Sequence, residues 1–181
     1  SSKETVKDVL RKITKRIRDL VRESKKTSDE SNKHIKELLE RSKKTIDELE
    51  RRIEDLRRRG DLDDDLLREA KELLERIERE SRRVFKEAEE LNKRSDDETR
   101  RIVKEAEDLI RTVEERLKRI EDEELLRRLI KELEDLMREI ERKLRELNER
   151  DKRLNEEIAK KLEKLNRDAR KLVEEIERRA R

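Results

Sequence analysis

Histidine is the side chain that ordinarily titrates near neutral pH, and the chain contains one, His34. A zinc site usually takes four ligands that include Cys or His, and a di-iron bundle takes Glu-x-x-His on two helices. The residue three before His34 is Ser31, and the sequence has no second histidine and no cysteine. We therefore expect no metal site, and we expect the His34 ring to donate to Asp151, Asn155 or a serine.

A carboxylate can also do chemistry, and Asp151 interrupts an otherwise apolar helical stripe. A carboxylate in such a place can have a perturbed pKa and act in catalysis. The serines, however, have no basic residue spaced to activate them, and a single glycine leaves no Gly-rich phosphate loop. We expect Asp151 to be a structural or rim residue, and we expect no catalytic residue, no cofactor and no enzymatic activity.

The composition indicates which elements must position these residues. Of the 181 residues, 59% are charged and 29% are hydrophobic. Low hydrophobicity is often a sign of disorder, but the net charge is only +3 and most residues are strong helix formers. Such a composition is typical of a coiled coil or a long helix. An apolar share of this size matches a narrow seam of about two positions in seven.

Two places in the chain have the residues of a helix end followed by a helix start. Gly60 follows three arginines and precedes four aspartates within five residues, and Asp122 precedes two glutamates. The sequence has no proline. We predict a single domain over residues 1–181, with loops near Gly60 and Asp122. Its helices are expected at about 3–58, 62–119 and 123–180.

Apolar residues recur about every 3.6 positions in each predicted helix, which is the natural period of an α-helix and predicts little supercoil. The predicted fold is all-α, an up-down-up bundle of three very long, nearly straight antiparallel helices. Capping boxes at 27–30 and 95–98, with a further break near 148–151, would instead give six shorter helices. The apolar period passes all three places without a change of phase, which favours three helices.

Polar residues interrupt the three seams at one height. In an up-down-up bundle, position i of the first helix faces about 121 − i, and position j of the second faces about 242 − j. Polar side chains from all three helices then meet, with His34 level with Asn155 and one turn from Asp151. The predicted polar core consists of Ser28, Ser31, His34, Asn92, Ser95, Asn148, Asp151 and Asn155.

A set of polar residues at one height is best explained as a buried hydrogen-bond network. An unpaired polar group in a core costs about 1–3 kcal/mol, whereas a satisfied network fixes register and partner choice. The alternative is that these positions are hydrated and partly exposed to solvent. Ser42, Ser81 and Asn166 are candidates for a second, smaller layer.

Charge also differs between the predicted helices. Residues 1–59 have 20 basic and 13 acidic side chains, and residues 60–121 have 16 and 21. A net charge of +7 beside one of −5 favours pairing of the first two helices. Residues 3–26 hold ten basic and four acidic side chains, but aromatic residues for base stacking are absent there. We expect no nucleic-acid binding, and the narrow seams predict no membrane binding. The first residues have no apolar stretch behind them, so we expect no signal peptide.

Four features of the sequence bear on its origin. They are the Leu/Ile seams, the Glu/Lys/Arg surfaces such as residues 131–140, the Gly60-Asp61 turn and the mid-core Ser/Asn/Thr/His set. In all of them the chain resembles de novo designed helical bundles with buried hydrogen-bond networks. The resemblance is one of style and covers all 181 residues. Evolved rods such as spectrin repeats differ, because they usually have aromatic core residues. The resemblance implies a protein made to supply a shape, without a natural biochemical activity.

Two other functions stay open. Apolar doublets such as Leu66-Leu67, Leu109-Ile110 and Leu125-Leu126 widen the seams locally. They could serve self-association or a designed helical partner, which would make the chain an interaction module. The third hypothesis is an evolved spectrin-like rod. The scaffold hypothesis requires no partner. The sequence does not indicate a localisation.

Overall fold

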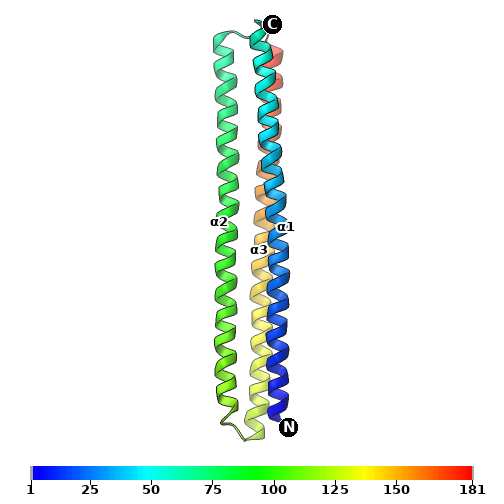
Figure 1. Cartoon of the computed structure of the whole chain (residues 1–181), viewed down its shortest axis with the longest axis vertical. Coiled ribbons are helices and arrows are strands. Elements are labelled where there is room, and N and C mark those ends of the chain that lie inside the picture. The colour runs from blue at the N-terminus through cyan, green and yellow to red at the C-terminus, as the bar shows by residue number, and fades with distance from the viewer. Residues whose placement is uncertain (1, 181) are drawn as a thin grey trace. The chain divides into compact units, whose positions relative to one another are not determined.

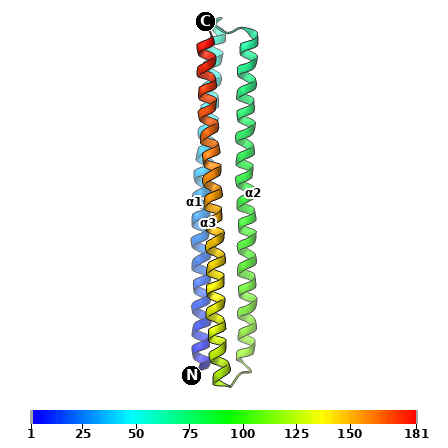
Figure 2. The ribbon, with the colours of Figure 1, turned by 180° about the vertical axis from the view of Figure 1, so that it is seen from behind.

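The structure is a computed structural model, and it describes residues 2–180. Helix α1 spans Ser2–Arg58, α2 spans Asp64–Leu117 and α3 spans Glu123–Arg179 (Figure 1; Figure 2). The three long helices pack against one another, and the described residues contain no strand. The predicted all-α three-helix bundle is therefore confirmed. Ser1 and Arg181, which the predicted domain included, lie outside the described residues.

Each helix is continuous where the shorter-helix alternative required a break. Residues 27–30 are helical within α1, 95–98 within α2 and 148–151 within α3. The alternative of six helices is wrong. Neither glycine nor proline occurs at these places, so nothing in the backbone opposes continued helical hydrogen bonding.

The connection between α1 and α2 depends on Gly60, which has a φ of 74°. Its N–H donates to the carbonyl of Arg57 at 3.0 Å, and the N–H of Asp61 donates to that of Leu56 at 3.0 Å. This pair of bonds is a Schellman motif, which needs a left-handed residue where glycine has no Cβ penalty. Asp63 then caps α2, because its Oδ1 accepts from the N–H of Leu66 at 2.7 Å.

The connection between α2 and α3 is capped in the same way by Asp122. Its Oδ1 accepts a hydrogen bond from the N–H of Glu124 at 2.9 Å. Two glutamates, Glu123 and Glu124, occupy the first turn of α3, where the helix dipole favours negative charge. Asp122 therefore starts α3 as the sequence predicted.

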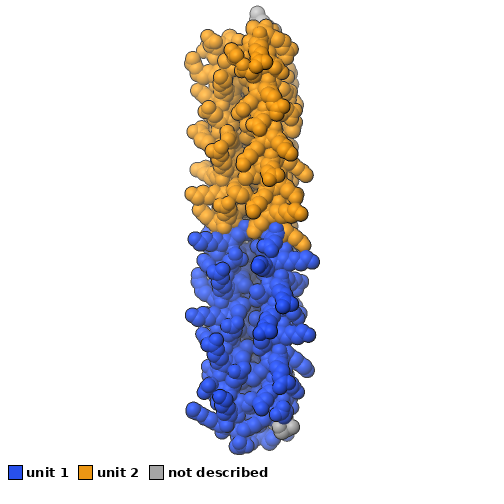
Figure 3. All heavy atoms as spheres, viewed as in Figure 1, with its two compact units in different colours: residues 1–29, 92–152 blue, residues 30–91, 153–181 orange. Residues whose placement is uncertain are grey.

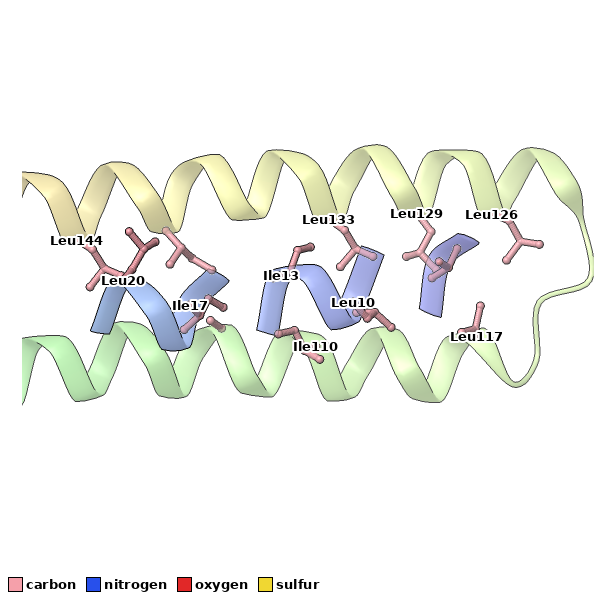
Figure 4. Packing of buried hydrophobic residues seen from close by; sticks show 13 residues of the cluster. Leu10, Ile13, Ile17, Leu20, Ile110, Leu117, Leu126, Leu129, Leu133 and Leu144 are labelled. Atoms are coloured by element: carbon pink, nitrogen blue, oxygen red, sulfur yellow. The ribbon is translucent and has the colours of Figure 1, made fainter. Parts of the chain in front are cut away.

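The chain divides into two compact units, each with a segment of all three helices (Figure 3). Unit 1 comprises Ser1–Asp29 and Asn92–Lys152, and unit 2 comprises Glu30–Leu91 and Arg153–Arg181. In unit 1, one apolar cluster contains Leu10 and Ile13 of α1, Ile110 of α2, and Leu129 and Leu133 of α3 (Figure 4). Burying each leucine there contributes about 1.5–3 kcal/mol.

Unit 2 contains two apolar clusters. Ile46 and Leu49 of α1 pack with Leu74 of α2 and Val173 of α3 in the first. The second cluster unites Ile35, Leu38, Val84, Ala88, Leu91, Ile158, Ala159 and Leu162. The buried polar side chains Ser42, Thr45 and Ser81 lie on the same seams as these clusters.

The apolar doublets show where the period alone was insufficient. A strict period of about 3.6 favours the first residue of three such doublets, but the structure buries the second residue more deeply in each. The buried residues are Leu74, Ile110 and Val173, which follow Leu73, Leu109 and Leu172. Leu109 is 47% exposed. A period of 3.6 fits a step of three or four equally well, so packing against the other two helices decides between adjacent apolar residues.

Candidate polar core

Helices α1 and α3 are joined in unit 1 by a polar contact on their seams. The Ser24 hydroxyl donates to Oδ1 of Asn148 at 2.6 Å, and both side chains are partly buried. Asn148 was a predicted member of the polar core, whereas Ser24 was not. The signal was present, because Ser24 lies on the apolar seam four residues after Leu20. The structure thus gives Asn148 a partner that sequence reasoning missed.

Helices α2 and α3 meet in unit 1 through Ser95 and Asp151. The buried Ser95 hydroxyl donates to Oδ2 of Asp151, as the predicted grouping of these two residues requires. Arg150 lies 3.8 Å from the other carboxylate oxygen, Oδ1, and 3.0 Å from Glu98 of α2. That Oδ1 is buried and has no hydrogen bond within the described residues.

The electrostatic state of Asp151 follows from these contacts. Burial raises the pKa of the Asp151 carboxyl, since the charged form loses water, and nearby Glu98 and Asp96 raise it further. The Ser95 hydrogen bond and the Arg150 charge act in the opposite direction and are outweighed. Asp151 is therefore a partly buried hydrogen-bond acceptor whose charged form is disfavoured by its surroundings.

Three other predicted members are half-buried. Ser28 of α1 and Asn92 of α2 lie in unit 1, and Ser31 of α1 lies in unit 2. Within the part of the chain that the structure describes, the hydroxyls of Ser28 and Ser31 make no hydrogen bond. These two serines agree with the alternative hypothesis, in which the polar positions are partly exposed to solvent.

In unit 2 the predicted member Asn155 is buried, with 7% of its surface exposed. Its Oδ1 atom has no hydrogen-bond partner among residues 2–180, and neither does the buried Oδ1 of Asn166. A buried acceptor without a partner is costly. In the core of unit 2, the side-chain oxygens of these two asparagines therefore lack hydrogen-bond donors.

Ser42 and Ser81 form the direct polar contact between α1 and α2 that the second layer predicted. Their hydroxyl oxygens are 3.2 Å apart, and the two side chains are 0% and 2% exposed. Ser81 also donates to the carbonyl of Ile77 at 2.9 Å. Because a hydroxyl has one proton, Ser42 is the donor in the contact between the serines. Asn166 is half-buried, and its Oδ1 takes no part in this pair.

His34 is a correction to the predicted polar core. The structure leaves its side chain exposed on α1, so it does not lie among the buried polar residues. The adjacent Ile35 holds the seam position and is 2% exposed. Successive helical residues are turned by about 100°, which directs His34 away from the core when Ile35 points into it.

The predicted register between α2 and α3 needs a correction of four to six residues, which is between one and two helical turns. Ser95 contacts Asp151, Glu98 contacts Arg150 and Glu87 contacts Lys161, so position j of α2 faces roughly 246 − j to 248 − j instead of 242 − j. The prediction treated residues 118–122 as a simple reversal. The shift means that the connection between α2 and α3 also advances along the helix axis, by more than one helical turn of about 3.6 residues.

Ion pairs between helices converge on α3. Arg16 of α1 pairs with Glu141 at 2.9 Å, and Arg52 of α1 pairs with Glu177. Lys161 and Arg179 of α3 pair with carboxylates of α2. The charge difference between the first two helices favours their pairing, whereas these ion pairs are made through α3.

Neither metal ligation nor membrane insertion gains support from residues 2–180. In that range no three His, Cys, Asp or Glu side chains are grouped so that they could hold a metal ion. No helix there combines the length and the apolar character needed to cross a bilayer. The chain matches no known family model, and no match was found among curated proteins or solved structures.

Proposed function

We propose that this protein is a designed structural scaffold with no natural biochemical activity, whose sequence serves to fix which helix faces which. The observation that carries the proposal is a repeated register between α1 and α3. In unit 1 the pairs Arg16–Glu141 and Ser24–Asn148 are separated by 125 and 124 positions. In unit 2 the pair Thr45–Arg170 is separated by 125.

Buried polar contacts support the same proposal, because they are poor sources of stability and good sources of specificity. A hydrogen bond contributes only about 0.5–1.5 kcal/mol net, but a shifted register would leave its groups unpaired in the core. The contacts Ser95–Asp151 and Ser42–Ser81 lie on the seams and would be lost by such a shift. We take the helices to pack as in a coiled coil, with these residues as register markers.

The designed origin is favoured by the resemblance to designed helical bundles, which use idealised seams, glycine turns and aspartate caps. The Gly60 turn and the Asp63 and Asp122 caps have that form. An evolved spectrin-like rod is the weaker alternative, since the sequence has one aromatic residue, Phe85, and no tryptophan.

The solution mass tests the scaffold proposal most directly. Light scattering on a sizing column should give a mass near 22.2 kDa, because each unit closes its own apolar clusters. Thermal unfolding should have a midpoint above about 90 °C, as idealised bundles do. A monomer that melts below about 65 °C would favour an evolved rod.

A designed interaction module is the second candidate, and one observation favours it. Leu109 and Leu125 each begin an apolar doublet, and they are 47% and 45% exposed. If they form an interface, the measured mass should be at least twice that of one chain. Leu109→Glu combined with Leu125→Glu should then restore the monomer, whereas Leu133→Ala, inside the core, should not. A mass of one chain at all concentrations would exclude self-association.

A further inference from the structure

The N-terminal part of α1 has a run of like charges that the scaffold proposal does not explain. Lys3, Lys7, Arg11 and Lys15 follow one another at intervals of four residues, and Arg18 comes three later. Residues at these intervals lie one above the other on a helix, where like charges are destabilising. The run therefore weakens α1 unless something negative lies against it.

These five residues line a groove between α1 and α2 of unit 1, which we term the unit 1 groove. Its volume is about 670 Å³, and its lining also includes Leu10, Leu117 and Lys118. One carboxylate lies in the lining, that of Glu114. The groove thus has an apolar floor and a basic rim.

Only part of the basic rim is neutralised within the chain. Lys3 lies 2.9 Å from Glu121 and forms an ion pair with it. Lys7 lies 3.6 Å from Glu4, and Arg11 lies 3.1 Å from Asp8, but both are exposed pairs that contribute little. Lys15, Arg18 and Lys118 form no ion pair within 4.0 Å among residues 2–180. Positive charge in excess remains available to an outside partner.

We propose that the unit 1 groove is a docking site for an acidic amphipathic helix. The helix would place apolar residues at i, i+3 or i+4, and i+7 on the floor, near Leu10 and Leu117. Glu or Asp residues on its flanks would pair with Lys7 and Lys15. Binding would then relieve the repulsion within α1. This inference does not depend on the proposed scaffold function, since it concerns what the groove binds.

A second groove, in unit 2, gives an internal comparison. It too lies between α1 and α2, has a volume of about 590 Å³ and an apolar floor that includes Ile53 and Leu74. Its rim carries more acid than base, from Asp47, Glu50 and other glutamates. Burial raises the pKa of the Glu50 carboxyl, and the charges of Asp47 and Glu78 raise it further. An acidic helix should be repelled from this groove.

Charge complementarity favours an acidic helix over other anionic partners. Single-stranded nucleic acids need aromatic side chains for base stacking, and the one aromatic residue, Phe85, lies in unit 2. Membrane-surface helices need a broad apolar face with Trp or Phe. The lining of the unit 1 groove has neither of these features.

The test uses the full chain and a labelled peptide of about 20 residues, long enough to lie along the groove. The peptide is Ala-rich, with Leu at helical spacing and Glu on both flanks. Fluorescence anisotropy at physiological salt should show saturable binding. A matched peptide with Lys flanks, and one with the Leu residues scattered, should bind at least about tenfold more weakly.

The groove variant and its control change the net charge by the same amount, and a third variant changes it by half as much. Lys7→Glu with Lys15→Glu should weaken binding at least about tenfold, and Lys7→Gln with Lys15→Gln about threefold. The control is Lys12→Glu with Arg22→Glu, two exposed residues of α1 outside the groove lining, and it should change affinity less than about twofold. Circular dichroism checks that every variant keeps its helical content.

Methyl NMR locates the bound peptide. The signals of Leu10 and Leu117 should shift on binding, and those of Ile53 and Leu74 in unit 2 should not. The proposal is overturned if no peptide binds at millimolar concentration, or if the control variant loses as much affinity as the groove variant. It is also overturned if single-stranded DNA, anionic vesicles or a second copy of the chain occupy the groove more tightly than the peptide.

Discussion

The Ser24 hydroxyl lies 2.6 Å from the side-chain oxygen of Asn148, its hydrogen-bond acceptor 124 positions later in the chain. Arg16 and Glu141 of the same unit are 2.9 Å apart and separated by 125 positions. Two contacts of different chemistry, one neutral and one ionic, thus require the same alignment of α1 and α3. A register shift would break both together.

The coupling between Ser24 and Asn148 can be measured by a double-mutant cycle. We expect Ser24→Ala and Asn148→Ala together to cost less than the sum of the single costs, with a coupling of about 0.5–1.5 kcal/mol. Chemical denaturation gives the free energies of unfolding. Thr14→Ala in place of Ser24→Ala is the control, since the Thr14 hydroxyl bonds to its own helix. Coupling equal to that of the control would contradict the bond.

Ser42 and Ser81 should respond unequally to alanine. Ser81→Ala leaves the buried Ser42 hydroxyl without its acceptor, whereas Ser42→Ala leaves Ser81 still bonded to the carbonyl of Ile77. Both changes gain the same helix propensity, so we expect Ser81→Ala to be less stable by about 1 kcal/mol. Equal free energies of unfolding would mean that the Ser42 hydroxyl turns back to its own helix.

Asp151 should make stability depend on pH in an unusual direction. Burial raises the pKa of this carboxyl above its unfolded value, so the folded state binds the proton more tightly. The protein therefore gains stability from this group as pH falls through the folded pKa, and loses it as pH rises.

Asp151→Asn removes the buried charge and can still accept from Ser95. We expect the variant to be more stable at pH 7, on the order of 1 kcal/mol, and the difference to shrink as pH falls. Urea titrations between pH 3 and 7 provide the comparison, within the range where carboxyls ordinarily titrate. Asp19→Asn, on an exposed face, is the control. A variant that is less stable than the wild type at pH 7, with a deficit that shrinks in acid, would show that the Arg150 pair dominates.

Replacing Gly60 should lower the free energy of unfolding by an amount that its positive φ determines. A Cβ at this position would meet nothing within 4 Å, so the penalty comes from its φ of 74° alone. We expect Gly60→Ala to lower the free energy of unfolding by about 1 kcal/mol and Gly60→Asn to lower it by less, because asparagine tolerates this conformation better. Equal losses would mean that the turn has changed its conformation.

Helix positions could be predicted from this sequence because they depend on local signals. Gly60 and Asp122 each stop or start a helix through bonds to nearby backbone groups, and the period of about 3.6 needs no partner. The helices found differ from the expected bounds by at most two residues at each end, as in α2, which spans Asp64–Leu117 where 62–119 was expected.

The contacts between helices could be predicted only in part. Ser95 and Asp151 were correctly grouped, but the partner of Asn148 is Ser24, and His34 lies outside the core. Register depends on how far residues 118–122 advance along the axis, which no residue type encodes. The choice between Leu109 and Ile110 likewise depends on packing against two other helices.

The separation of about 125 residues between α1 and its α3 partners has a consequence for the order of folding. A nascent chain that has emerged only through residue 121 holds Arg16, Ser24 and Thr45 but none of their partners. The fragment 1–121 should be helical by circular dichroism, yet its α1 amides should exchange with solvent faster than in the full chain. Equal protection would mean that α2 suffices. Otherwise, the last helix to leave the ribosome is the one that fixes the first.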